Sequence, residues 1–229
     1  AIARKLLKRG CRLEGVPGFF MNYHGDWEIA FYQKNNGYLC PVWSDEGLLI
    51  AFQIRLDVPY QKRKYVWLSS AKMEKGCSPG SPVSFSGVLN SPVVYVTEGV
   101  LKAEAAYQRT GHPYLGNPGV SAYKELELAL NRLKAHGVKV VIEANDMDKC
   151  IRLHCDRAYS EACADCEGSS HECPKKREKR DHIRKGCLKL YEICEKLGLI
   201  CKRAVWDTDD EGYWEENYKG IDDWELREL

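Results

Sequence analysis

Three acidic residues follow two short apolar runs of the sequence, in a pattern that suits metal binding. Glu98 ends the β-rich run VVYVTE, and Gly99 and a helix-forming segment follow at once. Asp146 and Asp148 follow a second apolar run, VKVVIEA, and residues two apart point to the same side of an extended chain. Carboxylate oxygens suit Mg²⁺ or Mn²⁺, which need few of them when phosphates and waters fill the remaining positions. We therefore expect Glu98, Asp146 and Asp148 to bind Mg²⁺ or Mn²⁺.

Such a site requires the two apolar runs to be strands of one sheet. From Val93 onward, β-rich runs alternate with helix-forming segments, which predicts an α/β fold with a parallel sheet flanked by helices. Ligands of such sheets bind at the carboxyl ends of the strands, where the three acids are expected. The expected strands are 93–97, VKVVIEA and GLICKRAVW, and the expected helices are 100–109, 122–136 and about 179–197.

The first 90 residues have a different pattern. Two β-rich runs, Gly37–Trp43 and Leu48–Leu56, are joined by SDEG, which is typical of a hairpin, and KYVWLSS follows as a third run. We expect a smaller N-terminal α+β subdomain of mostly antiparallel strands over residues 1–90 and the parallel-sheet domain over residues 91–229. A cysteine-rich insertion interrupts the second domain at about residues 150–187.

Several stretches of the sequence together resemble one known superfamily. They are VYVTEG, followed by a helix, and VVIEANDMD about 45 residues later, with the flanking stretches GVPGFF, GYLCPVWSDEGLLIAFQIRLD, KYVWLSS, TEGVLKAEAA and KGIDDW. This combination resembles the toprim superfamily, and in particular the toprim-like domain of primase-type replication proteins from plasmids, phages and integrative elements. The resemblance covers roughly residues 11 to 226, apart from the cysteine-rich insertion.

The resemblance implies a toprim-like fold and a function in DNA replication. Glu98, Asp146 and Asp148 would be the catalytic, metal-binding residues of a nucleotidyltransferase that makes primers on a single-stranded DNA template from nucleoside triphosphates. A helicase domain or protein is an expected partner. Two alternatives stay open, a toprim-type metal-dependent nuclease and a non-catalytic nucleic-acid-binding module.

Other charged residues near the expected strand ends have two interpretations each. Lys102 lies one turn after Glu98 and is expected either to pair with it or to face a triphosphate. Asp207 follows the last expected strand and either belongs to a solvated acidic loop or completes the metal site. Asp222 and Asp223, in KGIDDW, either support the site or serve as local caps.

The cysteine-rich segment contains a candidate zinc site. Cys163 and Cys166 form a short pair, and His171 and Cys173 follow, which are ligand types that suit tetrahedral Zn²⁺. Cys155 is an alternative fourth ligand. The competing interpretation is a loop of reduced cysteines.

Basic residues are concentrated in two places that could contact nucleic acid. Arg55, Arg63 and Lys64 lie near Tyr60 and Tyr65, and such mixtures bind single strands through phosphates and base stacking, although the aromatic residues could instead belong to the core. The run PKKREKRDHIRK is either a solvated helix face or a contact to the phosphate backbone.

Composition limits the remaining possibilities. The formal net charge is only +1, so any binding to nucleic acid must be local. No apolar run is long enough to span a membrane, and no signal-peptide pattern is present, so we expect a cytoplasmic protein without a membrane partner. Its 11 cysteines are then expected to be reduced thiols or metal ligands.

Overall fold

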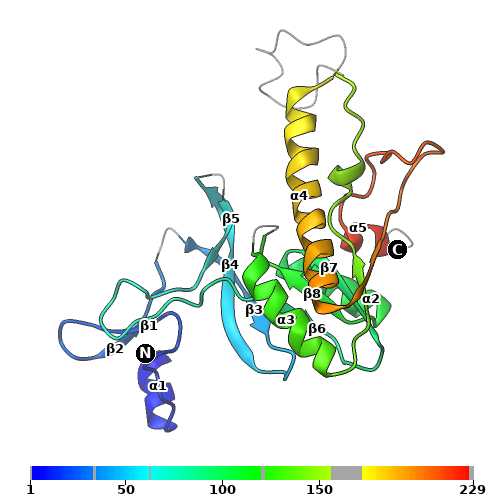
Figure 1. The fold of residues 1–229 in the computed structure, drawn as a ribbon. Helices are drawn as coiled ribbons and strands as arrows, with labels where there is room; N and C mark the ends of the chain where they lie inside the picture. The colour runs from blue at the N-terminus through cyan, green and yellow to red at the C-terminus, as the bar shows by residue number, and fades with distance from the viewer. Residues whose placement is uncertain (1, 33–34, 62, 120–121, 156–171, 227–229) are drawn as a thin grey trace. The chain divides into compact units, whose positions relative to one another are not determined.

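The structure, a computed structural model, divides the chain into two compact units, Ala1–Ser84 and Phe85–Leu229 (Figure 1). The division falls a few residues before the boundary expected at residue 90. The structure describes residues 2–32, 35–61, 63–119, 122–155 and 172–226. Each unit has its own strands and its own core, so each is described separately.

The first unit is built mostly from antiparallel strands, as the sequence predicts. A short helix is followed by a two-stranded antiparallel sheet of order β1-β2 and a three-stranded antiparallel sheet of order β3-β4-β5. The turn SDEG joins β3 to β4, and the amide of Ser44 donates to the carbonyl of Leu48 across it. The elements are α1 (Ile2–Lys8), β1 (Phe19–Met21), β2 (Trp27–Ile29), β3 (Gly37–Trp43), β4 (Leu49–Tyr60) and β5 (Arg63–Trp67).

Alternation along β4 determines which side chains enter the core of the first unit. Ile54 and Leu56, two residues apart on one face of the strand, are buried and pack with Leu68. Arg55, between them, points to the opposite face, because successive strand residues alternate. This register leaves Arg55 on the face away from that core.

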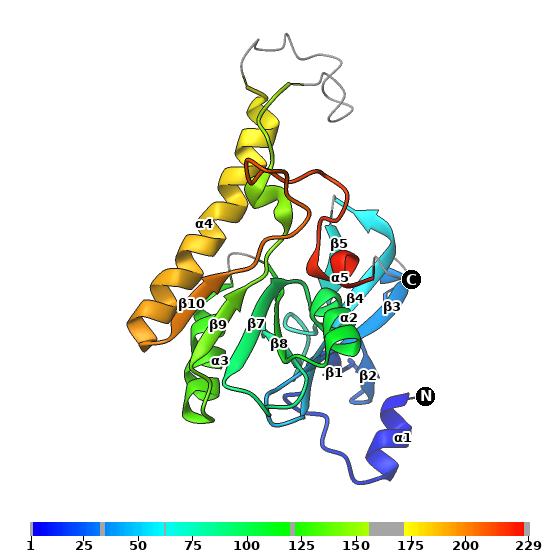
Figure 2. The ribbon, with the colours of Figure 1, turned by 90° about the vertical axis from the view of Figure 1, so that its right-hand side faces the viewer.

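The second unit contains a five-stranded sheet of order β10-β9-β7-β8-β6. Strand β7 pairs in parallel with both β8 and β9, and β9 pairs in parallel with β10. Helices flank this sheet, which confirms the expected α/β class (Figure 2). The elements are β6 (Ser84–Ser86), β7 (Val93–Glu98), α2 (Val100–Thr110), β8 (Tyr114–Asn117), α3 (Tyr123–Ala135), β9 (Val140–Glu143), η2 (Met147–Cys150), α4 (Pro174–Leu197), β10 (Ile200–Arg203) and α5 (Ile221–Glu225).

Helix α4 differs from its predicted bounds. It begins at Pro174 rather than near residue 179, because proline fits the first turn of a helix, where its missing N–H costs nothing. The helix therefore includes the second part of the segment that the cysteine spacing assigned to an insertion. Its 24 residues span about 36 Å, far more than the four residues of β9, and its first half extends beyond the sheet (Figure 1). None of the described helices is long and apolar enough to cross a membrane.

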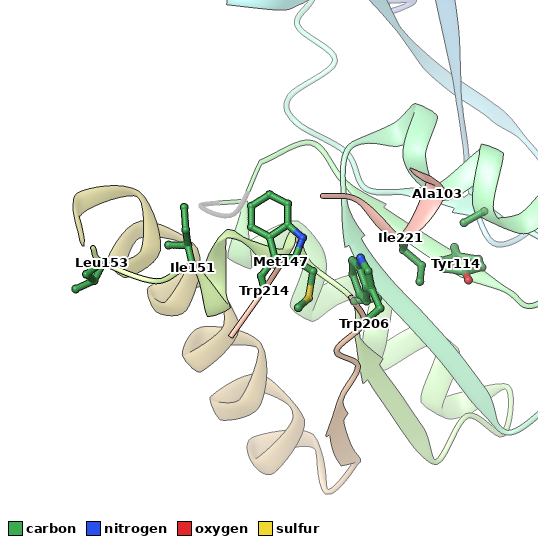
Figure 3. Packing of buried hydrophobic residues seen from close by; sticks show 10 residues of the cluster. Ala103, Tyr114, Met147, Ile151, Leu153, Trp206, Trp214 and Ile221 are labelled. Carbon is green, nitrogen blue, oxygen red and sulfur yellow. The ribbon is translucent and has the colours of Figure 1, made fainter. Parts of the chain in front are cut away.

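A buried cluster in the second unit joins the segments around the strand ends. Met147, Trp206 and Ile221 come from η2, the segment after β10, and α5, and all three are at most 5% exposed (Figure 3). Met147 lies between Asp146 and Asp148 in the sequence, so its burial fixes the backbone that carries both acids. Packing of apolar side chains thus positions the polar residues next to it.

Candidate functional site

The three predicted acids lie at the ends of adjacent strands. Glu98 ends β7, whose neighbour β9 ends at Glu143, and the amide of Ala144 donates to the carbonyl of Val96 just beyond the last pair. Asp146 follows two residues after Ala144. Because β7 and β9 are parallel, Glu98 and Asp146 leave the sheet at the same edge, as the sequence predicts.

Gly99 explains why a glycine follows Glu98. Its φ of 97° lies in the left-handed region, where a residue with a side chain is strained. The chain uses this conformation to turn from β7 into α2, and the Gly99 amide donates to the carbonyl of Asn117 on β8 at 2.6 Å. The turn positions Glu98 at the sheet edge and Lys102 one helical turn later.

Both aspartates are buried, and lysines from two helices and one loop compensate their charge. Lys102 of α2 pairs with Asp146. The Nζ of Lys219 lies 3.3 Å from Oδ2 of Asp146 and 2.7 Å from Oδ2 of Asp148, and that of Lys179, on α4, lies 3.1 Å from Oδ1 of Asp148. Asp146 is 4% exposed and Asp148 is 1% exposed, and carboxylates this buried require such partners.

Glu98 and Asp222 share this electrostatic environment. Burial raises the pKa of Glu98, the charge of Asp146 raises it further, and Lys102 and Lys219 oppose the shift. Burial also raises the pKa of Asp222, which is influenced in opposite directions by Lys102 and Asp146. The site therefore contains four carboxyl groups near one another, two of which have a reduced tendency to ionise.

The carboxylate oxygens of Asp146 and Asp148 are suitable ligands for a divalent cation. Among the described residues, no group of three or more His, Cys, Asp or Glu side chains is arranged to hold a metal ion. The Lys219 ammonium group is nevertheless in reach of one oxygen from each aspartate, so it stands in for a cation between them. Both oxygens of Asp148 are buried, and in the described residues each of them faces a lysine ammonium group. Two carboxylates suffice for Mg²⁺ when water and phosphate complete its shell.

Asp207 has a defined structural role. Its Oδ2 accepts hydrogen bonds from the amides of Asn217 and Tyr218, and its Oδ1 accepts one from the side-chain amide of Asn217. These bonds close the loop that leads to Lys219. A role of Asp207 in metal binding stays a prediction. Asp223 accepts a hydrogen bond from the Gly220 amide and so caps the start of α5, in agreement with the local interpretation.

The predicted zinc ligands lie only partly within the described structure. Cys163, Cys166 and His171 lie outside the described residues. Cys173 is buried immediately before α4, and Cys155 is partly buried. The zinc site stays a prediction.

A cavity lined by both lysines and acidic residues lies along the first half of α4. It has a volume of about 610 Å³ and is lined by Lys175, Glu178, Lys179, Asp181, His182 and Lys185. Lys179 also pairs with Asp148, and the charge of His182 influences Glu98, so this cavity adjoins the acid cluster. Part of the basic run of the sequence therefore lines this cavity, and its contact to nucleic acid stays a prediction.

In the first unit, Arg55 lies between two tyrosines on one face of the three-stranded sheet. The strand register pairs Arg55 with Tyr38 on one side and with Tyr65 on the other. The Arg55 guanidinium carbon lies 5.0 Å from the centroid of the Tyr65 ring, which is within cation–π distance. Tyr38 is 53% exposed and Tyr65 is 39% exposed, so both rings are accessible for stacking. Arg63 and Lys64 lie on the adjacent strand β5.

Comparison with known proteins identifies a similar fold. The chain is similar to a crystal structure of the Aquifex aeolicus primase, comprising its zinc-binding and RNA polymerase domains, with a TM-score of 0.51 at 12% identity over 90% of this chain and 40% of that one. A DNA primase domain from Pseudomonas aeruginosa matches with a TM-score of 0.47 at 14% identity over 95% of this chain and 56% of that one. The chain therefore spans about half the length, or less, of these solved chains. The first likeness shows a shared fold. No family model and no curated protein matches.

Sequence reasoning missed two of the basic residues at the site. Lys219 belongs to KGIDDW, a stretch that contributes to the toprim resemblance but does not itself indicate a role for the lysine. Lys179 belongs to the basic run PKKREKRDHIRK. A lysine flanked by glycine after the last strand is a weak signal by itself. Only the folded chain shows that both lysines reach Asp148.

Proposed function

We propose that this chain is the metal-dependent nucleotidyltransferase core of a DNA primase-type replication protein, which synthesises primers on single-stranded DNA. One observation carries the proposal: two buried aspartates and a glutamate lie at one edge of a parallel sheet, and the aspartates share a single cationic group. The fold shared with a primase structure supports it. An origin in a plasmid, phage or integrative element and a helicase partner also belong to the proposal, and they rest on motifs such as KGIDDW.

The residues of the site have distinct roles in this proposal. Asp146 and Asp148 would hold Mg²⁺ or Mn²⁺, with Glu98 beside them. The bound cation would neutralise the triphosphate and stabilise charge that develops on the α-phosphate. Burial and Asp146 raise the pKa of Glu98, which suits that carboxyl group to accept a proton from the attacking 3′-hydroxyl group.

The basic residues would bind the substrates. Lys175 and Lys185, in the cavity along α4, supply ammonium groups for the triphosphate next to the acid cluster. In the first unit, the Tyr38–Arg55–Tyr65 row would stack bases of the template, while Arg63 and Lys64 contact phosphates. Such contacts bind a single strand without strong sequence preference, as a template-reading enzyme requires.

A gel assay tests this function. The chain is incubated with single-stranded DNA, labelled nucleoside triphosphates and Mn²⁺, beside Glu98→Gln and Asp146→Asn. Glu104→Gln is the matched control, because Glu104 lies on α2 and accepts a hydrogen bond from Gln108 one turn later on the same helix. New short oligomers that vanish in the two site variants and persist in the control support a primase.

Other products would change the assignment. Shortened template that depends on Mn²⁺ and Asp146 would identify a nuclease, in which water replaces the 3′-hydroxyl group as the nucleophile. DNA binding that is equal in all variants, without any product, would identify a non-catalytic module.

A further inference from the structure

The backbone of Lys219 is held by hydrogen bonds of the neighbouring segments, whereas its side chain is partly exposed. The amide of Met147 donates to the Lys219 carbonyl at 2.9 Å, and Nε1 of Trp206 donates to the Tyr218 carbonyl at the same distance. Farther along the loop, Lys176 pairs with Glu216 at 3.1 Å. The Lys219 side chain is 42% exposed, whereas its partners Asp146 and Asp148 are almost fully buried. Its ammonium group can therefore move into solvent while its backbone stays in place.

We propose that Lys219 is a tethered counter-cation, which occupies the cation position between Asp146 and Asp148 in the metal-free protein and withdraws when a divalent cation binds. The inference rests on the proposed function only in taking these aspartates as the metal site. Two cations cannot share the same pair of oxygens, because their mutual repulsion at such a distance is large. Metal binding must therefore break both contacts that Lys219 makes.

The other lysines do not have the same position. Lys102 pairs with Asp146 and Lys179 pairs with Asp148, whereas the Lys219 ammonium group lies within 4 Å of both aspartates. Its ammonium group lies 3.3 Å from Oδ2 of Asp146 and 2.7 Å from Oδ2 of Asp148. The ammonium group is thus held by the same pair of charges that a metal ion would use.

Two consequences follow for a variant without this charge. In Lys219→Met, two buried carboxylates lose their shared partner, so the metal-free protein is expected to unfold at a temperature about 5 °C lower. The same variant no longer has to displace an ammonium group, so its affinity for Mn²⁺ is expected to rise at least about tenfold. Saturating Mn²⁺ should remove the difference in unfolding temperature. A lysine that serves only structure would lower stability without tightening metal binding.

The test measures unfolding temperature in EDTA and in Mn²⁺, and Mn²⁺ affinity from the electron paramagnetic resonance signal of the free ion. Five forms of the 229-residue chain are compared: wild type, Lys219→Met, Lys219→Gln, Lys219→Arg and Lys189→Met. Lys189 is the control, because it lies on α4 and pairs with Glu192 on the helix surface. Lys219→Arg keeps the charge and is expected to retain the wild-type stability and affinity. If Lys219→Met does not fold, Lys219→Gln replaces it. The Mn²⁺ affinity of Lys219→Gln is then compared with that of Lys219→Arg and should be higher.

The outcomes separate this inference from the proposed function. Tighter Mn²⁺ binding by Lys219→Met supports the inference even if the wild type makes no primers. Unchanged or weaker binding, or no Mn²⁺ binding by either protein, overturns it even if primers are made.

Discussion

The buried ion pair beneath the acid cluster gives a quantitative test of how the fold positions the site. Lys149 is 1% exposed and donates from Nζ to Oε1 of Glu143 at 2.9 Å and to the carbonyl of Ala204 at 2.8 Å. Glu143 ends β9, Lys149 lies in η2 next to Asp148, and Ala204 follows β10. This one ammonium group therefore joins three segments at the sheet edge.

Removal of Lys149 should leave a fully buried carboxylate without its main partner. Breaking one side of a buried pair costs roughly 3–5 kcal/mol, and Arg203, whose Nε lies 3.4 Å from Oε2 of Glu143, places Lys149→Met near the lower value. A loss of about 3 kcal/mol corresponds to a fall of roughly 6–12 °C in unfolding temperature. The double variant Glu143→Gln with Lys149→Met should be closer to wild type, because it removes the uncompensated charge.

Differential scanning calorimetry and urea unfolding would measure both variants against the exposed control Lys189→Met. A loss below about 1 kcal/mol for Lys149→Met, or a double variant less stable than the single one, would refute the argument that this pair fixes the sheet edge.

Further predictions concern local conformation, protonation, template binding and the cysteine-rich segment. Gly99→Ala should destabilise the chain by about 1–2 kcal/mol in urea unfolding, because its φ of 97° strains alanine, although apart from its chain neighbours the added Cβ would meet only the Lys102 side chain, at 3.9 Å, among the described residues. Folding raises the pKa of Glu98, so the stability of the wild type should fall as the pH rises from about 4.5 through the pKa of the folded state. Above this pH range Glu98→Gln should be more stable than the wild type, and below it the two should be equally stable. Unfolding measured as a function of pH checks both expectations. In fluorescence anisotropy, Arg55→Ala should weaken single-stranded DNA binding and reduce its salt dependence, whereas Tyr65→Ala should weaken binding by about 1–3 kcal/mol with little change in that dependence. Cys163→Ser should lower the zinc content of the purified protein, as measured by mass spectrometry. A wild-type protein without zinc, or a variant with the same zinc content as the wild type, would contradict the zinc hypothesis.

Local patterns in the sequence were sufficient for the strands and for the acids at their ends. Strands β7 and β9 are apolar runs bounded by polar residues, and Gly99 is a local requirement of the turn that follows Glu98. Helix α4 begins earlier than the sequence predicts, at Pro174, because proline suits the first turn of a helix whereas the cysteines before it carry no backbone signal.

An α/β chain with three acids at neighbouring strand ends could be predicted from the sequence, because alternation, turn residues and strand termini are properties of short segments. Which cations meet those acids depends on the tertiary structure. Lys179 and Lys219 come from α4 and from the loop before α5, and no local pattern relates either of them to Asp148. Their positions depend on how α4 packs against η2 and on the hydrogen bonds that Asp207 and Met147 make to the loop. Charge compensation between distant segments is a property of packing, and for this reason it became visible only in the folded chain.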